Sequence, residues 1–267
     1  MGATCGATAL LERTPRDPEA VREHLLRLVE RFERRGDRRA VFGSAYLIMT
    51  DEILAMLRRG EFRAPSWVER LTVHFYAYYL RALRSETAGA AGPLAPAWRV
   101  AFDCCDRGDD LVLRALLLGM NAHINHDLPL ALADLLRAGG AALESDYERV
   151  LGAVQRVIGP IQRRVGQRYA PGLLLLGEAM LGFDEWFTFT VVRAWRRTTW
   201  EQARALASPE AARERRRVVE RSMWIARLLS FPEGPPHLVR SLARLEQLDV
   251  RALPRAPNER GVGIRTT

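Results

Sequence analysis

The chain has 267 residues, enough for one large domain with a sizeable core or for two small domains. Hydrophobic residues make up 48% and charged residues 27%, which is typical of a soluble globular protein. The formal net charge is +8, and all 40 basic residues are arginine because the sequence has no lysine. The use of arginine in place of lysine is typical of the product of a GC-rich genome. The arginines are spread along the chain among acidic residues, so we do not expect a nucleic-acid partner.

The three cysteines predict no disulfide framework, since Cys104 and Cys105 are neighbours and no CxxC pair occurs. A reducing compartment fits this usage. The first residues lack the basic and apolar regions of a signal peptide, and the longest apolar runs are too short to span a bilayer. We therefore expect a cytoplasmic protein without a membrane partner, and the sequence leaves its oligomeric state open.

Helix signals begin after residues 1–14, which we expect to be disordered. Asp17, Pro18 and Glu19 form an N-cap, a first-turn proline and an acidic first turn, and they predict a helix that ends near Arg35. Further helices are predicted, in chain order, at about residues 38–59, 66–85, 93–105, 109–126, 129–137, 145–168, 183–207 and 209–229, with a short one after Pro171 and a last one ending near residue 248. Period-two alternation is absent, so no β-strand is expected.

We expect residues 15–250 to form a single all-α domain of about nine helices, followed by a disordered tail over residues 251–267. Residues 109–126 are apolar on most of the helix circumference, which places this helix at the centre of the bundle. Pro129 is expected to break or kink the chain before it continues as a helix to Arg137.

The strongest candidate for a functional site ends the central helix. The stretch from Asn121 to Asp127 holds two Asn, two His and one Asp in seven residues, directly after an apolar run from Leu111 to Met120. Buried polar groups are costly unless partners, a ligand or a metal satisfy them. This stretch is therefore where we expect a site.

Helical phase divides the cluster. His123 and Asp127 continue the apolar stripe of Leu116 and Met120, so both should face the core. The pair could share a metal ion, or Asp127 could orient the imidazole for acid–base work. The structural alternative is that Asp127 caps the helix restarted by Pro129 while His123 bonds a backbone carbonyl.

The other polar residues of the stretch fall elsewhere on the helix. Asn121 and Asn125 share a second face, where they could bind a ligand's polar groups or cross-link helices. His126 lies off the core stripe and is expected to be peripheral.

A second histidine, His74, shares an apolar stripe with Trp67, Leu71 and Tyr78. We expect His74 to be either the distant partner of His123 or a satisfied core histidine. The aromatic residues beside it could line an apolar pocket that offers hydroxyl groups, or they could be plain core. These residues are Phe75, Tyr76, Tyr78 and Tyr79.

Three further residues complete the candidate set. Asp184 begins a predicted helix, either as an additional metal ligand or as an N-cap. Tyr46 and Arg193 are candidate substrate-binding residues. Common catalytic motifs are absent: the sequence has no GxGxxG, P-loop, GxSxG or HExxH, and no Glu precedes His74, His123 or His126 by three residues as a ferritin-type di-iron site requires.

The run Gly-Met-Asn-Ala-His-Ile-Asn-His-Asp-Leu-Pro-Leu-Ala-Leu, residues 119–132, resembles the signature of an uncharacterised bacterial family of unknown function. That family is common in actinobacteria and has an N-A-H-I-N-x-D-L-P core. Weaker likenesses at residues 42–50, 60–67 and 192–200 extend the resemblance over about residues 38–230. The resemblance implies an all-helical fold and no settled activity, and it points to Asn121, His123, Asn125 and Asp127.

A fainter similarity links the chain to zinc-dependent phospholipase C and the P1-type nucleases, which are all-helical and carry His and Asp ligands on core helices. The chain departs from them because it has five histidines, no secretion signal and no N-terminal Trp. What this similarity implies is at most a single divalent metal such as zinc, held by His123, Asp127, His74 and Asp184.

Three classes of function follow, and the sequence does not decide among them. The first is an enzyme that transforms a small, partly apolar molecule, either by metal-assisted hydrolysis or by metal-free acid–base catalysis of a cyclisation, isomerisation or dehydration. The second is a non-catalytic small-molecule-binding protein. The third is a helical structural or interaction protein whose polar cluster only fixes the register of its helices.

Overall fold

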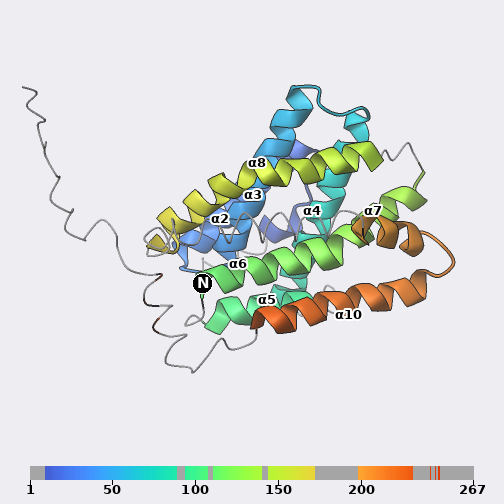
Figure 1. The fold of residues 1–267 in the computed structure, drawn as a ribbon. Coiled ribbons are helices and arrows are strands. Elements are labelled where there is room, and N and C mark those ends of the chain that lie inside the picture. Colours follow the sequence, from blue (N-terminus) through green and yellow to red (C-terminus); the bar gives the residue numbers. More distant parts are fainter. Residues whose placement is uncertain are drawn as a thin grey trace, which may run out of the picture.

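The computed structural model describes residues 10–88, 94–107, 111–139, 144–171 and 198–230, together with Ser241, Arg244 and Glu246. Within these residues the fold is helical and contains no strand, which confirms the predicted all-α class (Figure 1). Asp184, Arg193, the short helix predicted after Pro171 and the tail predicted over residues 251–267 lie outside the described residues.

One long rod runs through the bundle, with the other helices packed around it. The elements are α2 (Pro18–Arg34), α3 (Arg39–Arg58), α4 (Pro65–Ala88), α5 (Pro96–Arg107), α6 (Val112–Asn121), the π-helical turn η1 (Ala122–Asp127), α7 (Leu128–Arg137), α8 (Glu144–Arg168) and α10 (Ala211–Ser230). Residues 198–206 are also helical. In Figure 1, α6, η1 and α7 form the rod, with α8 above it and α5 and α10 below it.

Local signals place most helix ends where the sequence predicts them. Asp17 caps α2 by accepting a 2.7 Å hydrogen bond from the Ala20 backbone N–H. Gly36 and Gly60 follow α2 and α3 with φ of 64° and 69°, a left-handed conformation that glycine adopts without strain. The predicted boundaries of α2 and α3 are thereby confirmed to within a residue or two.

Residues 10–14 are bound to the bundle, although we expected them to be disordered. The Nε2–H of His24 donates to the Leu10 carbonyl at 2.6 Å. Arg84 donates to the carbonyls of Leu11 at 2.6 Å and Glu12 at 3.1 Å. These hydrogen bonds hold the segment against α2 and α4.

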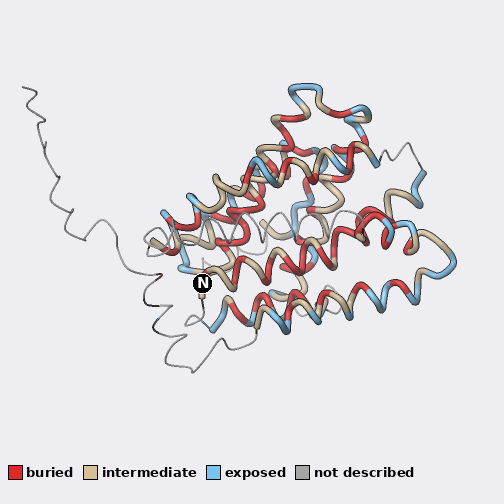
Figure 2. The backbone as a smooth tube through the Cα atoms, in the orientation of Figure 1, coloured by how far each residue is buried: buried red, intermediate tan, exposed pale blue. Residues whose placement is uncertain are grey.

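The predicted central helix lies in the core (Figure 2). Val112, Leu116 and Leu118 are buried along α6. Gly119 allows a close approach to α3, because a Cβ at this position would lie only 2.7 Å from Cγ of Phe42. The contact between α3 and α6 therefore depends on a residue without a side chain.

The predicted break at Pro129 is instead a widened turn. The backbone N–H of Leu128 bonds the carbonyl of His123, five residues earlier. A proline has no N–H to donate, and its ring clashes with the carbonyl four residues before it, so the turn ahead of Pro129 opens from α to π geometry. The helical path then continues to Arg137, and all the candidate residues of the motif lie on or beside the π turn.

One described helix, α3, is long and apolar enough to span a bilayer by composition, with a mean hydropathy of 1.5. Of the residues in that apolar window, 61% are buried inside the protein. This burial is what the core helix of a helical bundle shows.

Candidate functional site

The carboxylate of Asp127 is the polar centre of the motif. Its side chain is 2% exposed and accepts three hydrogen bonds. Oδ2 accepts from Nε1 of Trp98 at 2.8 Å and from Nδ1 of His123 at 3.1 Å, while Oδ1 accepts from Nδ1 of His126 at 2.8 Å. The predicted contact between His123 and Asp127 is therefore present.

His126 was expected at the periphery, but the structure makes it a direct partner of Asp127. Its side chain is 12% exposed. The π turn changes the angular spacing of successive residues, so the phase of a regular α-helix misplaces this side chain. The contact also joins adjacent residues, which a search for residues three or four positions apart does not examine.

Hydrogen bonding and burial fix the protonation state of the pair. Burial lowers the pKa of His123, and the hydrogen bond to Asp127 only partly opposes this effect. Burial raises the pKa of Asp127, but hydrogen bonds from His123 and His126 outweigh it and leave the pKa below its usual range. At neutral pH the pair is a neutral imidazole with its proton on Nδ1, facing an ionised carboxylate.

Five aromatic rings enclose the imidazole of His123, which is 3% exposed. Phe75 stacks on it with a centroid distance of 3.6 Å and an interplanar angle of 6°. Tyr46 follows at 4.6 Å. The remaining rings, Phe42, Tyr79 and Trp98, have centroids 5.7, 6.0 and 6.0 Å away.

Two buried polar atoms in this cage have no hydrogen-bond partner. One is Nε2 of His123, the nitrogen that does not face Asp127, and the other is the hydroxyl of Tyr46. Burial raises the pKa of Tyr46 well above its ordinary value, so the hydroxyl keeps its proton. The cage thus contains an unused acceptor and an unused donor on rings 4.6 Å apart.

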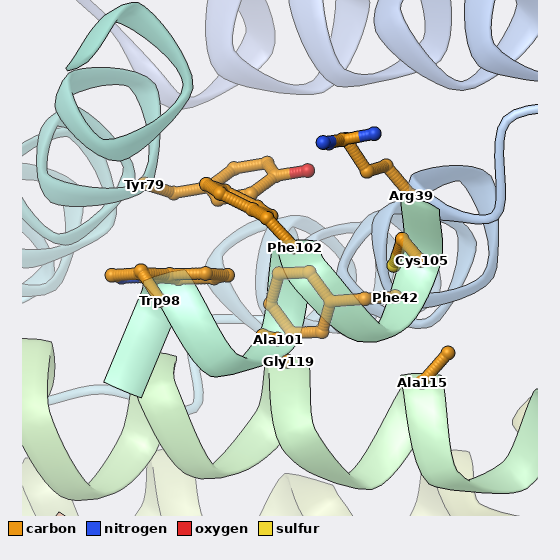
Figure 3. A pocket seen from close by; sticks show the side chains of 9 residues that line it. All are labelled: Arg39, Phe42, Tyr79, Trp98, Ala101, Phe102, Cys105, Ala115 and Gly119. Carbon is orange, nitrogen blue, oxygen red and sulfur yellow. The ribbon is translucent and has the colours of Figure 1, made fainter. Parts of the chain in front are cut away.

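Three rings of the cage also line a small cavity of about 10 Å³ (Figure 3). A cavity of this size holds about one water molecule. Its other walls are Arg39, Ala101, Phe102, Cys105, Ala115 and Gly119. Burial raises the pKa of the Cys105 thiol to about 12, so this wall does not supply a thiolate.

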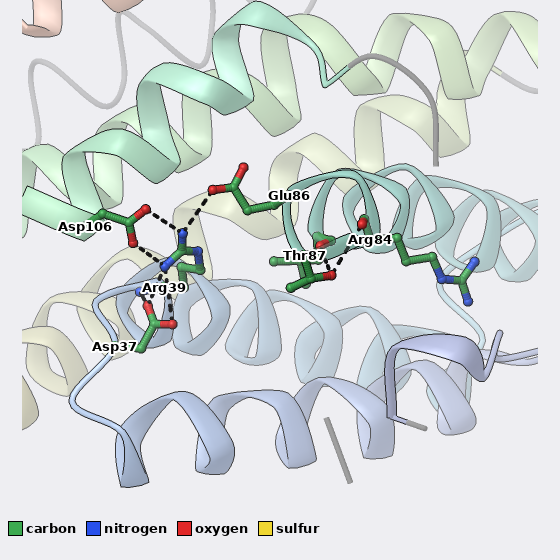
Figure 4. Close-up of polar contacts among 7 residues, drawn as sticks. Asp37, Arg39, Arg84, Glu86, Thr87 and Asp106 are labelled. Atoms are coloured by element: carbon green, nitrogen blue, oxygen red, sulfur yellow. Dashed lines mark hydrogen bonds and ion pairs between the residues drawn. The ribbon is translucent and has the colours of Figure 1, made fainter. Parts of the chain in front are cut away.

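Arg39 is the charged residue in the wall of the cavity. Its guanidinium pairs with Asp37 at 3.1 Å and with Asp106 at 2.7 Å, and it reaches Glu86 at 3.5 Å (Figure 4). The same group lies 5.1 Å from the ring centroid of Phe102. Its positive charge is therefore engaged by side chains from α4, α5 and the turn before α3.

The two asparagines link helices, which is one of the two roles predicted for them. Nδ2 of Asn125 donates to Oδ1 of Asn121 at 3.0 Å. Nδ2 of Asn121 donates to the backbone carbonyl of Ser222 on α10 at 2.9 Å. The pair fixes the π turn against α10, while Oδ1 of Asn125 has no partner.

His74 and Tyr78 lie in a second cluster that is centred on Asp134 rather than Asp127. His74 Nε2 and the Tyr78 hydroxyl contact the same Asp134 oxygen at 2.9 and 2.6 Å. The side chains of His74 and Asp134 are 36% and 33% exposed. The structure therefore does not bring His74 to His123, because the next residue on α4, Phe75, is the one that faces inward.

Sequence reasoning did not identify Trp98 and Asp134 as participants, and it named Phe75 only as one of several aromatic residues that could line a pocket. Trp98 donates to Asp127 from α5, Phe75 stacks on His123 from α4, and Asp134 receives His74 from α7. Asp134 could have been found from the sequence, because it lies seven residues, or two helical turns, after Asp127, which places both on the same side of a regular helix. The contacts of Trp98 and Phe75 depend on how separate helices pack, which no local pattern records.

The donor set does not fit the predicted metal site. Among the described residues, no three His, Cys, Asp or Glu side chains gather as metal ligands. Of the three predicted ligands that the structure describes, His123 and Asp127 are brought together and His74 is not, and the facing atoms of His123 and Asp127 already bond each other. A protein zinc site needs at least three such ligands, and only Nε2 of His123 is unused here.

The comparisons with known proteins give a family and no activity. No curated protein and no solved structure matches the chain. A family described as a family of unknown function (DUF5995) matches residues 19–231, a stretch that contains the whole π turn and both clusters. The predicted membership of such a family is confirmed, and the chain belongs to this family of unknown function, DUF5995.

Proposed function

We propose that the protein is an enzyme that transforms a small, partly apolar molecule by metal-free acid–base catalysis, with His123 as the general base. The observation that carries this proposal is the unpartnered Nε2 of His123. Its other nitrogen is fixed by a buried carboxylate. An unsatisfied buried acceptor costs the fold stability, which supports a role other than holding the chain together.

The proton-transfer step would use the pair as it stands. Nε2 of neutral His123 takes a proton from the substrate, and the imidazolium that forms is stabilised by the ionised Asp127 at 3.1 Å. In an isomerisation or cyclisation the proton returns to another atom of the same molecule. In a dehydration it leaves with the departing hydroxyl group as water. No metal takes part in any of these steps.

Tyr46 supports the proposal as a hydrogen-bond donor. Its hydroxyl is protonated, buried and without a partner, and its ring is 4.6 Å from that of His123. A donor placed beside a base can stabilise the oxygen anion that develops when a proton next to a carbonyl group is removed.

The cage limits what could reach Nε2. Phe75 covers one face of the imidazole, so a substrate must approach along the ring edge. The enclosure is complete enough that the aromatic rings have to move apart before a substrate can enter, and the walls it would then meet are aromatic. These features favour a small apolar molecule that carries one oxygen function.

A structural role is the second candidate, and the enclosure of the motif is the observation that favours it. Asp127 has a partner for each oxygen, and the Asn121–Asn125 pair ties the π turn to α10. On this reading the polar residues specify how α4, α5, α7 and α10 pack around the turn.

The two candidates are separated by a search for conversion in a complex mixture. Purified protein is incubated with a bacterial metabolite extract, and compounds are followed by liquid chromatography and mass spectrometry, since an isomerisation changes retention without changing mass. We expect at least one compound to be consumed by the wild type and not by His123→Gln. His74→Gln, the same substitution in the half-exposed cluster, is the matched control and should convert it like the wild type.

Two further arms make the outcome decisive. Tyr46→Phe should fold normally and slow the conversion, so a loss in this variant is not a folding defect. Dialysis against EDTA should leave the rate unchanged. If no compound changes in a His123-dependent way, the structural candidate takes the place of the enzyme, and a rate lost with EDTA and restored by zinc would contradict the metal-free mechanism.

A further inference from the structure

The outer face of α10 is unusual among the described surfaces because large apolar side chains are exposed on it. Among the described residues, two large apolar side chains are exposed: Trp224 at 61% and Leu228 at 55%. They are four residues apart on the same helix, so they are neighbours on one face. Scattered single apolar residues need no explanation, but an exposed Trp beside an exposed Leu does.

The inner face of α10 packs against the rest of the bundle. Its buried side chains, Glu214, Val218, Ser222 and Ala226, recur every fourth residue. This face contacts α5, α6 and η1. Trp224 is two positions from Ser222 and from Ala226, about half a helical turn away, so it lies on the face of α10 opposite the buried one. The helix itself runs along the lower edge of the bundle (Figure 1).

The same outer face is strongly basic. The exposed residues of α10 include five arginines and a single acidic residue, Glu220. Arg213, Arg217 and Arg227 lie eleven and seven residues before Trp224 and three after it, spacings that keep them on its side of the helix. Arginine and tryptophan therefore occupy one surface along the length of α10.

We infer that the outer face of α10 binds an anionic lipid bilayer surface, with Trp224 and Leu228 inserted at the level of the headgroups and the arginines against lipid phosphates. Helices of this composition lie in the plane of a membrane interface, and tryptophan prefers that depth. Each basic residue near an anionic leaflet adds to the attraction. The proposal is independent of the chemistry at His123.

The pattern fits a lipid surface better than a protein groove. A helix that docks in a groove presents apolar residues at positions i, i+3 or i+4, and i+7. Here the positions four and seven residues before Trp224 are Glu220 and Arg217, so charged residues bound the apolar pair on its N-terminal side, and among the described residues the apolar contact consists of two side chains. The absence of a long apolar run led us to expect no membrane partner, but a peripheral contact requires no such run.

Vesicle co-sedimentation of the full chain tests the inference. The vesicles are phosphatidylcholine alone or phosphatidylcholine with about a third phosphatidylglycerol, in about 0.1 M KCl, where surface charges are only partly screened. We expect binding to the anionic vesicles, a blue shift of tryptophan emission on binding, and release at about 0.5 M KCl. Trp224→Ser/Leu228→Ser should abolish the blue shift and most of the binding.

The charge arm has a matched control. Arg213→Gln/Arg227→Gln should weaken binding about thirtyfold, the effect of two basic residues near an anionic surface. Arg58→Gln/Arg99→Gln removes the same charge from exposed positions on α3 and α5 and should bind within about twofold of the wild type, because those residues belong to other helices than α10. Circular dichroism and thermal unfolding confirm that each variant is folded.

The inference is overturned by any of three results: no sedimentation with anionic vesicles, equal binding to neutral vesicles, or unchanged binding by Trp224→Ser/Leu228→Ser. It is also overturned if single-stranded DNA binds the chain with the same dependence on Arg213 and Trp224 while vesicles do not, since the face would then recognise a nucleic acid.

Discussion

Tyr76 and Tyr46, two buried tyrosines with ring centroids 6.1 Å apart, differ in how their hydroxyl groups are used. The hydroxyl of Tyr76 donates to Nδ1 of His24 at 2.8 Å, and His24 in turn donates to the Leu10 carbonyl. The hydroxyl of Tyr46 is equally buried and has no partner. The first tyrosine contributes a hydrogen bond to folding, whereas the second contributes only its ring.

We predict opposite effects when each hydroxyl is removed. Tyr46→Phe should raise the free energy of unfolding by about 1 kcal/mol, because a buried donor without a partner disappears and the ring remains. Tyr76→Phe should lower it by about 1 kcal/mol, because Nδ1 of His24 loses its donor. Urea denaturation followed by circular dichroism measures both, and a destabilised Tyr46→Phe would show that this hydroxyl supports the fold.

The charge on Asp127 leads to a second prediction. Asp127→Asn should lower the free energy of unfolding by about 3 kcal/mol, since an amide cannot accept from Trp98, His123 and His126 at once and its NH₂ group opposes one of the donors. Nitrogen-15 NMR of the imidazole should show the proton on Nδ1 in the wild type and a changed tautomer in the variant. The control Asp134→Asn is half-exposed and should lose about 1 kcal/mol.

Helical phase predicted the contact between His123 and Asp127, because their separation of four residues is a property of the chain alone. It misplaced His126, because the phase assumes α geometry and the turn is π. It chose His74 over Phe75, because the core-facing side of α4 shifts between Leu71 and Tyr76, where the neighbours of the helix change. The sequence thus predicts which residues face the site only where the local helix geometry is regular.

At the scale of elements, the π turn and Gly119 set the path of the central rod. The turn absorbs Pro129 without a break, and Gly119 lets α6 approach the ring of Phe42. Phe42 is one of the rings around His123, so the distance between α3 and α6 also determines how tightly the cage closes.

Gly119→Ala should therefore destabilise the protein even though alanine favours helices. The new Cβ would lie 2.7 Å from Cγ of Phe42, and overpacking of this kind costs about 1–3 kcal/mol. Gly152→Ala on α8 is the matched control, since nothing lies within 4 Å of its added Cβ. That control should gain about 0.5–1 kcal/mol from helix propensity alone. Thermal unfolding of both variants checks the difference, and a Gly119→Ala variant as stable as Gly152→Ala would show that α3 and α6 can separate freely.

For the whole molecule, the helical class and the central place of residues 109–126 were predictable, because apolar periodicity and capping residues act locally. The partners of each helix were not predictable, because packing partners are chosen by surfaces that fold together. The separation of the Asp127 and Asp134 clusters is the clearest case. The helices that carry His74 and Asp134 were predicted, but the rotation of one relative to the other was not.

The dependence of stability on pH should report both buried histidines of the described residues, His24 and His123, together. Burial lowers the pKa of both His24 and His123 below the ordinary value of about 6.5. The unfolded chain then binds protons more readily than the folded one as the pH falls below about 6.5, so acid favours unfolding. The free energy of unfolding should be highest above this pH and decrease steadily toward pH 5.

The decrease should continue below about pH 4 for a different reason. Hydrogen bonds leave the pKa of Asp127 and of Asp134 below the usual range despite partial or full burial, so protonation of these carboxylates again favours the unfolded chain. Urea denaturation at a series of pH values measures the whole curve. His24→Gln should flatten its upper part, while Arg99→Gln, an exposed change that removes no titrating histidine, should leave the slope intact. A free energy of unfolding that stays constant from about pH 7 to 5 would mean that both imidazoles take up protons inside the folded protein as easily as in water, which a sealed aromatic cage does not allow.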